Sequence, residues 1–192
     1  MLSKKAMLVQ EIKNGTHNLN LPKENLSGVD LSGVNLDGAN LRGADLTDTN
    51  LSGASLIGAY LIGANLTWVS LDGAKLIDAN LTDAKLIYTN LTNANLDGAN
   101  LRGINLRGAD LTGANLQRAN LSCANLYKAY LTEVNLIGAD LYKAYLVRTN
   151  LTGANLSKAD LTNTNLSNAN LDGVNLDGAD LTNTNLTGTN LA

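Results

Sequence analysis

Leucine recurs at every fifth position of the chain, from Leu21 to Leu191, without interruption. Such a strict period indicates a repeat architecture. A step of five residues suits neither regular element. On an α-helix it rotates successive leucines by about 140°, and on a flat strand it sends them to opposite faces. The chain must therefore turn once in every five residues if all the leucines are to lie on one side.

A second inward position is predicted two residues before each leucine. It is usually alanine, as at Ala39 and Ala44, and Ile104 is its largest occupant. Residues two apart in an extended stretch point to the same side, so this residue and the leucine should face inward together. The residue between them is usually Asn or Asp, as at Asn40, and should point outward or into the corner.

The other two positions of each repeat are predicted to form a corner. All but one of the 18 glycines lie two residues after a leucine. A type II turn needs positive φ at its third residue, which glycine adopts freely. Where a bulkier side chain stands at this position, we expect the corner to avoid positive φ. The corners in question are those of Arg118, Lys128, Glu133, Lys143 and Arg148.

The pattern A-(N/D)-L-x-x, which covers residues 21–192, closely resembles the pentapeptide repeat family. The resemblance implies an all-β fold, a right-handed quadrilateral β-helix with four pentads in each coil. Residues 21–192 would then form a single solenoid domain of about eight to nine coils, with every leucine of the repeat buried. A coil of four pentads also places Trp68 and Tyr88 in one corner column, where their rings should stack.

Residues 1–20 do not follow the repeat and are predicted to cap the solenoid and lead into its first coil. Ser3 is a suitable helix N-cap, and Leu8 and Ile12 have helical apolar spacing. We predict a short amphipathic α-helix over Ser3–Asn14 that covers the exposed edge of the first coil. A helix that binds a partner is the alternative interpretation.

The composition provides little for catalysis or metal binding. His17 is the only histidine, and Cys123, the only cysteine, is expected at an exposed corner. We therefore expect no enzyme activity, no metal and no cofactor. Cys123 is interpreted as an ordinary corner residue, with a redox or linking role as the alternative. No apolar run is long enough for a membrane span or a signal peptide, so we expect a soluble cytoplasmic protein.

One corner of the predicted coil departs from the small polar residues found elsewhere. Aromatic residues and arginine are enriched at protein interfaces, and here they recur at one place in the coil. The predicted protein-binding patch consists of Trp68, Ile87, Tyr88, Arg107 and Tyr127. Lys128 and Arg148 continue the same column, and Lys85 and Tyr145 should lie near it. The alternative interpretation is stacking between coils that tightens corners without glycine.

Charge is distributed in zones along the chain, although the net charge is only −3. Residues 1–23 carry +3, residues 24–101 carry −6, residues 102–158 carry +4 and residues 159–192 carry −4. A nucleic-acid-binding protein is usually more basic overall. We therefore expect no nucleic acid or membrane partner, and the positive zone is also consistent with an ordinary solvated surface.

The favoured functional hypothesis is a non-catalytic protein–protein interaction or regulatory scaffold whose protein partner is unknown. By resemblance, some family members act as regulators in cyanobacteria, including in cell differentiation. A first alternative is a DNA-mimicking protein that interacts with topoisomerase or gyrase, as other family members do. A second is a purely structural or stress-related protein. The repeat runs to the last leucine, so a homodimer through an uncapped C-terminal end is also predicted. No small-molecule substrate is expected.

Overall fold

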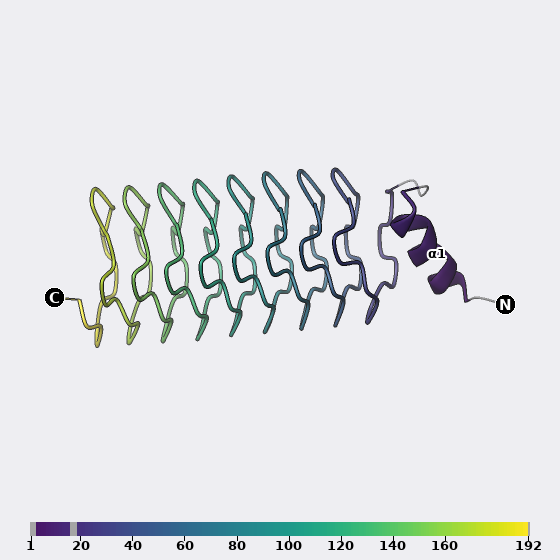
Figure 1. The fold of residues 1–192 in the computed structure, drawn as a ribbon. Coiled ribbons are helices and arrows are strands. Elements are labelled where there is room, and N and C mark those ends of the chain that lie inside the picture. Colours follow the sequence, from purple (N-terminus) through teal and green to yellow (C-terminus); the bar gives the residue numbers. More distant parts are fainter. Residues whose placement is uncertain (1–2, 16–18, 192) are drawn as a thin grey trace.

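The computed structural model describes residues 3–15 and 19–191. One helix, α1 (Lys4–Lys13), stands at the N-terminal end of a row of stacked coils that runs to the C-terminus (Figure 1). The coils are joined by parallel β-bridges from Asn20↔Asn40 to Asn165↔Asn185, and each bridge links residues 20 positions apart. Four bridges fall in each coil, so a coil consists of four pentads.

The bridges are isolated rather than combined into strands over the part of the chain that the structure describes. The physical reason is the length of each side. Because a turn occupies every pentad, one residue per side can form a bridge before the chain changes direction. The fold is therefore a solenoid with four turns per coil, whose sides are too short for regular strands.

The pentad Asn115–Ala119 shows how the backbone donors are satisfied. The amide N–H groups of Asn115, Leu116 and Arg118 donate to carbonyl oxygens of the neighbouring coils, over 2.9, 2.7 and 3.0 Å. The N–H of Ala119 closes the turn on the carbonyl of Leu116 at 3.1 Å. The fifth donor, the N–H of Gln117, binds the side-chain oxygen of Asn115 at 3.2 Å. No backbone donor of this pentad is left unpaired, as a buried ladder requires.

The expectation that bulky corner residues avoid positive φ is wrong. Each of the five adopts a φ between 55° and 59°, close to the 62–72° of the repeat glycines. The ladder explains this result, because the N–H of Arg118 donates to Ile137 just as the N–H of Gly98 donates to Gln117. A change of turn type would break that bond and the register of the coil. Closure of the coil therefore overrides the local preference of the side chain.

The core is a column of leucine and small residues along the solenoid axis. Each repeat leucine from Leu21 to Leu171 is buried, and Ile104 is buried at an alanine position. The prediction that every leucine is buried is wrong for the last coil. Leu176, Leu181 and Leu186 are only partly buried and Leu191 is 42% exposed, since no coil of the described residues covers them.

Helix α1 packs on the first coil through one face. The Ser3 hydroxyl accepts a hydrogen bond from the N–H of Ala6 at 3.1 Å, the side-chain contact of an N-cap. Leu8 and Ile12 are buried against the solenoid core, whereas Met7 is exposed. The side-chain amine of Lys5 donates hydrogen bonds to the carbonyl oxygen and to the hydroxyl oxygen of Ser27. The apolar contacts cover the leucines of the first coil, which explains why Leu21 is fully buried.

A pH-sensitive contact joins the helix to the first coil. Hydrogen bonds from the hydroxyl and N–H of Ser32, and from Lys13 at 3.2 Å, lower the pKa of Asp30 from 3.8 to about 2. The carboxylate form therefore favours the folded state. Its contribution is complete above pH 3.8 and is lost as the pH falls towards 2.

We expect Asp30→Asn to flatten the fall of melting temperature between about pH 4 and pH 2, because that variant has no carboxylate to protonate there. Thermal unfolding followed by circular dichroism at a series of pH values measures this. Above about pH 5 the two melting curves should keep a constant offset. Parallel curves over the whole acidic range would contradict the assignment.

Candidate interaction surface

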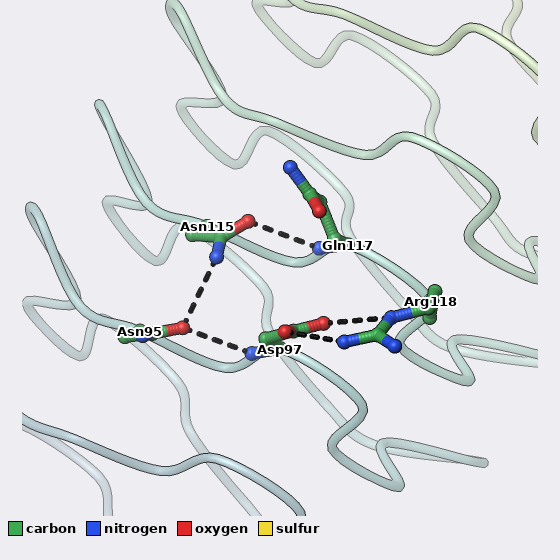
Figure 2. A network of polar contacts seen from close by, with 5 residues as sticks. All are labelled: Asn95, Asp97, Asn115, Gln117 and Arg118. Carbon is green, nitrogen blue, oxygen red and sulfur yellow. Dashed lines mark hydrogen bonds and ion pairs between the residues drawn. The ribbon is translucent and has the colours of Figure 1, made fainter.

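Most polar side chains on the outer surface are engaged in the fold itself. Figure 2 shows one such network, in which the oxygens of Asn95 and Asn115 accept the N–H groups of Asp97 and Gln117. The side-chain amide of Asn115 also donates to Asn95 on the preceding coil at 3.2 Å. These side chains extend the backbone ladder outward. Because their polar atoms are used within the fold, these side chains do not indicate a binding or catalytic site.

Arg118 is a cation that the fold neutralises. Its guanidinium binds the carboxylate of Asp97 through two hydrogen bonds of 3.1 and 2.5 Å (Figure 2). The hydrogen bond and the negative charge of Asp97 raise the pKa of Arg118 further above its ordinary value. An exposed pair of this kind contributes little to stability. It shows that a cation at a corner forms an ion pair where a carboxylate lies within reach.

A different corner gathers aromatic rings and cations, and we call it the corner face. It is made of Trp68, Ile87, Tyr88, Arg107, Tyr127, Lys128, Tyr130, Tyr145 and Arg148. Trp68 and Tyr88 stack with ring centroids 4.7 Å apart and planes 23° from parallel, as the column spacing predicts. Trp68 is 58% exposed, so the stack leaves a large aromatic surface in contact with water.

A second cluster on the corner face is centred on Tyr127. The guanidinium carbon of Arg107 lies 5.8 Å from the Tyr127 ring centroid, and the Lys128 amine lies 5.4 Å from it. Tyr145 stacks on the same ring from the next coil, with centroids 6.1 Å apart. Cation–π contacts of this length hold both charged groups near the ring but leave their hydrogen-bond donors free.

Four of the five residues predicted from the sequence form two contacting pairs in the structure, and the fifth, Ile87, lies in the same column. Trp68 pairs with Tyr88, Arg107 pairs with Tyr127, and Ile87 is half-buried. Its carbonyl accepts the N–H of Trp68 at 3.1 Å, so it belongs to the same column. The sequence-based patch omitted Lys128 and missed Tyr130, which is 55% exposed. The sequence does contain a signal for Tyr130, because it stands two residues after the corner position of Lys128, at the start of the following side of the coil.

A shallow hollow of about 250 Å³ lies within the corner face. Tyr88, Arg107, Gly108, Lys128 and Tyr130 line it. The Tyr88 ring lies over Gly108, since a Cβ added to this glycine would be 2.5 Å from Cε1 of Tyr88. The absence of a side chain at Gly108 is therefore what makes room for the Tyr88 ring.

We expect Gly108→Ala to displace Tyr88, whereas Gly53→Ala should not. Both glycines have a φ of 65°, so both variants have a backbone cost of about 1 kcal/mol, but the added Cβ at Gly53 meets no atom within 4 Å. Emission of Trp68, which stacks on Tyr88, measures the displacement. A changed spectrum in Gly108→Ala alone is the expected result. Identical spectra in both variants would contradict the geometry of the hollow.

The remaining predicted residues do not form a site. Cys123 is exposed and free, at a corner. His17 lies outside the described residues. Among the residues that are described, no three of the types His, Cys, Asp and Glu gather as metal ligands. The same residues contain no helix that is long and apolar enough to cross a membrane.

Comparison with protein families gives a match along most of the sequence. A family model described as pentapeptide repeats matches residues 25–63, 64–103, 99–136, 129–168 and 159–192. No curated protein matches the chain significantly.

Solved structures with the same kind of coil show two levels of similarity. HetL, a pentapeptide repeat protein involved in heterocyst differentiation regulation from the cyanobacterium Nostoc sp. strain PCC 7120, is 33% identical. The alignment covers 98% of this chain and 97% of HetL, with a TM-score of 0.50. A trypsin-treated variant of QnrB1, a plasmid-mediated fluoroquinolone resistance protein, has a TM-score of 0.69 at 24% identity. That alignment covers 84% of this chain and 86% of the QnrB1 variant. At this identity the second likeness shows the fold alone.

Proposed function

The chain belongs to the pentapeptide repeat family, and we propose that it is a non-catalytic scaffold that presents its corner face to a protein partner. Likeness to the family implies a right-handed β-helix, which makes the solenoid of residues 21–192 a stiff rod capped by residues 1–20. On such a rod the spacing of outward side chains is fixed by the coil. Little conformational entropy is then lost from the backbone when a partner binds.

The observation that carries this proposal is the exposed aromatic surface of the corner face. Four aromatic side chains of this face are exposed: Trp68, Tyr88, Tyr130 and Tyr145. Neighbouring corners form the same turn with Gly, Ser or Asn. Tyr, Trp and Arg are enriched among the residues that dominate the binding energy of protein interfaces, and aromatic rings bury large areas there. A coil does not need these residues in order to close, so their gathering favours an interface.

A regulatory role is the finer part of the proposal. HetL is involved in heterocyst differentiation regulation, and its likeness to this chain extends over almost the whole of both sequences. We propose by analogy that this chain also acts as a regulator, through a protein that it binds rather than through chemistry of its own.

Site-specific crosslinking tests the proposal directly. A photoreactive amino acid is introduced at Tyr88 or, as a matched control, at Asp78, which has a φ of 54° against 56° and stands at an exposed corner two turns away. We expect crosslinks to a protein partner in host cells from Tyr88 only. The double variant Tyr88→Ala, Arg107→Glu should lose binding of that partner while its melting temperature stays nearly unchanged. A partner that binds the double variant as well as the wild type would exclude the corner face.

A DNA-mimicking protein that interacts with DNA gyrase is the alternative, and the charge distribution weighs against it. Mimicry of duplex DNA needs a strongly negative surface, whereas this chain has a net charge of −3 and a positive zone over residues 102–158. We expect no inhibition of gyrase supercoiling at protein concentrations near that of the enzyme. Inhibition at a stoichiometric ratio would reverse the order of the two proposals.

We also propose contact between two copies of the chain through the last coil, where Leu181, Leu186 and Leu191 are more exposed than the central leucines. Light scattering after size exclusion should give a mass near twice 20.1 kDa. The variant Leu186→Glu should give the mass of one chain, because the contact would bury its charge.

A further inference from the structure

We infer that the hollow of the corner face binds a short acidic segment of a polypeptide, with carboxylates on Arg107 and Lys128 and the aromatic walls against the peptide backbone. This inference rests on the proposed function and names the chemistry of the partner. Three features of the molecule support it: the unpaired cations, the shape of the hollow, and the acidic zones on either side of the positive one.

The cations of the corner face have no carboxylate partner. Within residues 3–15 and 19–191, neither Arg107, Lys128 nor Arg148 forms an ion pair. Arg118, by contrast, is bound by Asp97. Arg107 and Lys128 instead lie beside one ring, that of Tyr127, and both side chains are exposed. An anion bound by both side chains would accept charge-assisted hydrogen bonds from their donors.

Asp110, an acidic residue on a coil that lines the hollow, is already engaged. Asp110 stands one coil before Tyr130 in the bridge Asp110↔Tyr130. Its carboxylate accepts the N–H and the hydroxyl of Thr112, at 2.9 and 2.6 Å. It therefore serves its own turn as an Asx-type cap rather than the cations of the hollow. The positive potential of the hollow remains available to an external carboxylate.

The shape of the hollow suits a side chain on a thin backbone. Tyr88 and Tyr130 are the aromatic residues of its lining, and its volume is about 250 Å³. Arg107, Lys128 and Arg148 are spread over neighbouring coils, about 4.8 Å apart along the axis. Two such steps span about 10 Å, which corresponds to about three or four residues of an extended peptide at about 3.3 Å each.

The flanking charge favours an acidic peptide over a nucleic acid. Residues 102–158 carry a net +4, but residues 24–101 carry −6 and residues 159–192 carry −4. A single strand that ran along the rod would meet these acidic zones within a few coils. A segment of about four acidic residues fits between them.

Fluorescence anisotropy with two labelled peptides tests the inference. One contains four glutamates between glycines, and the other contains four glutamines instead. The double variant Arg107→Gln, Lys128→Gln, which we call the hollow variant, removes both cations that line the hollow. The matched control is Arg102→Gln with Arg118→Gln, which removes the same charge from other corners of the positive zone. We expect the glutamate peptide to bind the wild type and the control, and to bind the hollow variant at least about tenfold more weakly. The glutamine peptide should not bind.

Three results would overturn the inference. The first is equal loss of affinity in both double variants, which would mean that only the overall charge matters. The second is binding of a twenty-nucleotide oligothymidylate as tight as that of the glutamate peptide. The third is no binding of the glutamate peptide at low salt. If that peptide fails but crosslinks from Tyr88 still capture a partner, the acidic segment is wrong and the scaffold function stands. If both fail, the scaffold function falls as well.

Discussion

Replacing Leu106 by alanine is expected to lower the free energy of unfolding by about 2–5 kcal/mol. Leu106 is 1% exposed in the middle of the leucine column. Its own N–H is fixed to the carbonyl of Asn125 at 2.8 Å, and its carbonyl accepts the N–H of Ala109 at 3.0 Å. Because the backbone is held on both sides, the coil cannot collapse into the space left by the side chain, and most of the cavity cost should remain.

Leu191→Ala is the matched control for this prediction. It removes the same atoms from the same position of the repeat, but Leu191 is 42% exposed. Measured for both leucine variants in the Leu186→Glu background, where the proposed contact between copies is absent, its cost should be within about 0.5 kcal/mol, as for an ordinary surface site. Chemical denaturation followed by circular dichroism gives both values, provided that the slope against denaturant is unchanged. A Leu106→Ala cost as small as that of Leu191→Ala would mean that the central column is not the stabilising core.

The sequence predicts the repeat unit well because a single rule operates in every pentad. The phase of the leucines identified the inward positions, and the 20-residue column correctly paired Trp68 with Tyr88. The rule fails where a residue responds to something outside its own pentad. Arg118 adopts positive φ because a neighbouring coil requires its N–H, and Leu186 is partly exposed because no described coil covers it.

The candidate site was only partly accessible to the same reasoning. A column of residues 20 apart is visible in the sequence, so Trp68, Tyr88 and Arg107 could be placed together. The hollow also needs Tyr130, two residues after the corner position, and the room that Gly108 leaves for the Tyr88 ring. Those two contributions depend on how far rings extend across a corner. Position in the repeat does not encode that distance.

Proline substitution at two neighbouring sites should separate the ladder from the turn. Asn115→Pro removes an N–H that donates to the carbonyl of Ala94 at 2.9 Å, and leaves that acceptor without its partner inside the stack. We expect a loss of about 3 kcal/mol or more, as for a proline within regular structure. Asn115→Ala serves as its control, because it removes the same amide side chain and keeps the N–H.

Gln117→Pro, two residues later, should cost less than about 1 kcal/mol. Position 117 follows a leucine and is the second residue of the turn, where proline is favoured. The chain itself has Pro22 at the equivalent position after Leu21. Only the bond from the Gln117 N–H to the Asn115 side chain is lost, and its length of 3.2 Å marks it as the weakest of the pentad's five. Equal destabilisation by the two prolines would mean that the ladder and the corner contribute alike. A much larger cost for Asn115→Pro would show that the hydrogen bonds between coils stabilise the solenoid more than the turns do. The same inter-coil bonds explain why the bulky corner residues adopt positive φ.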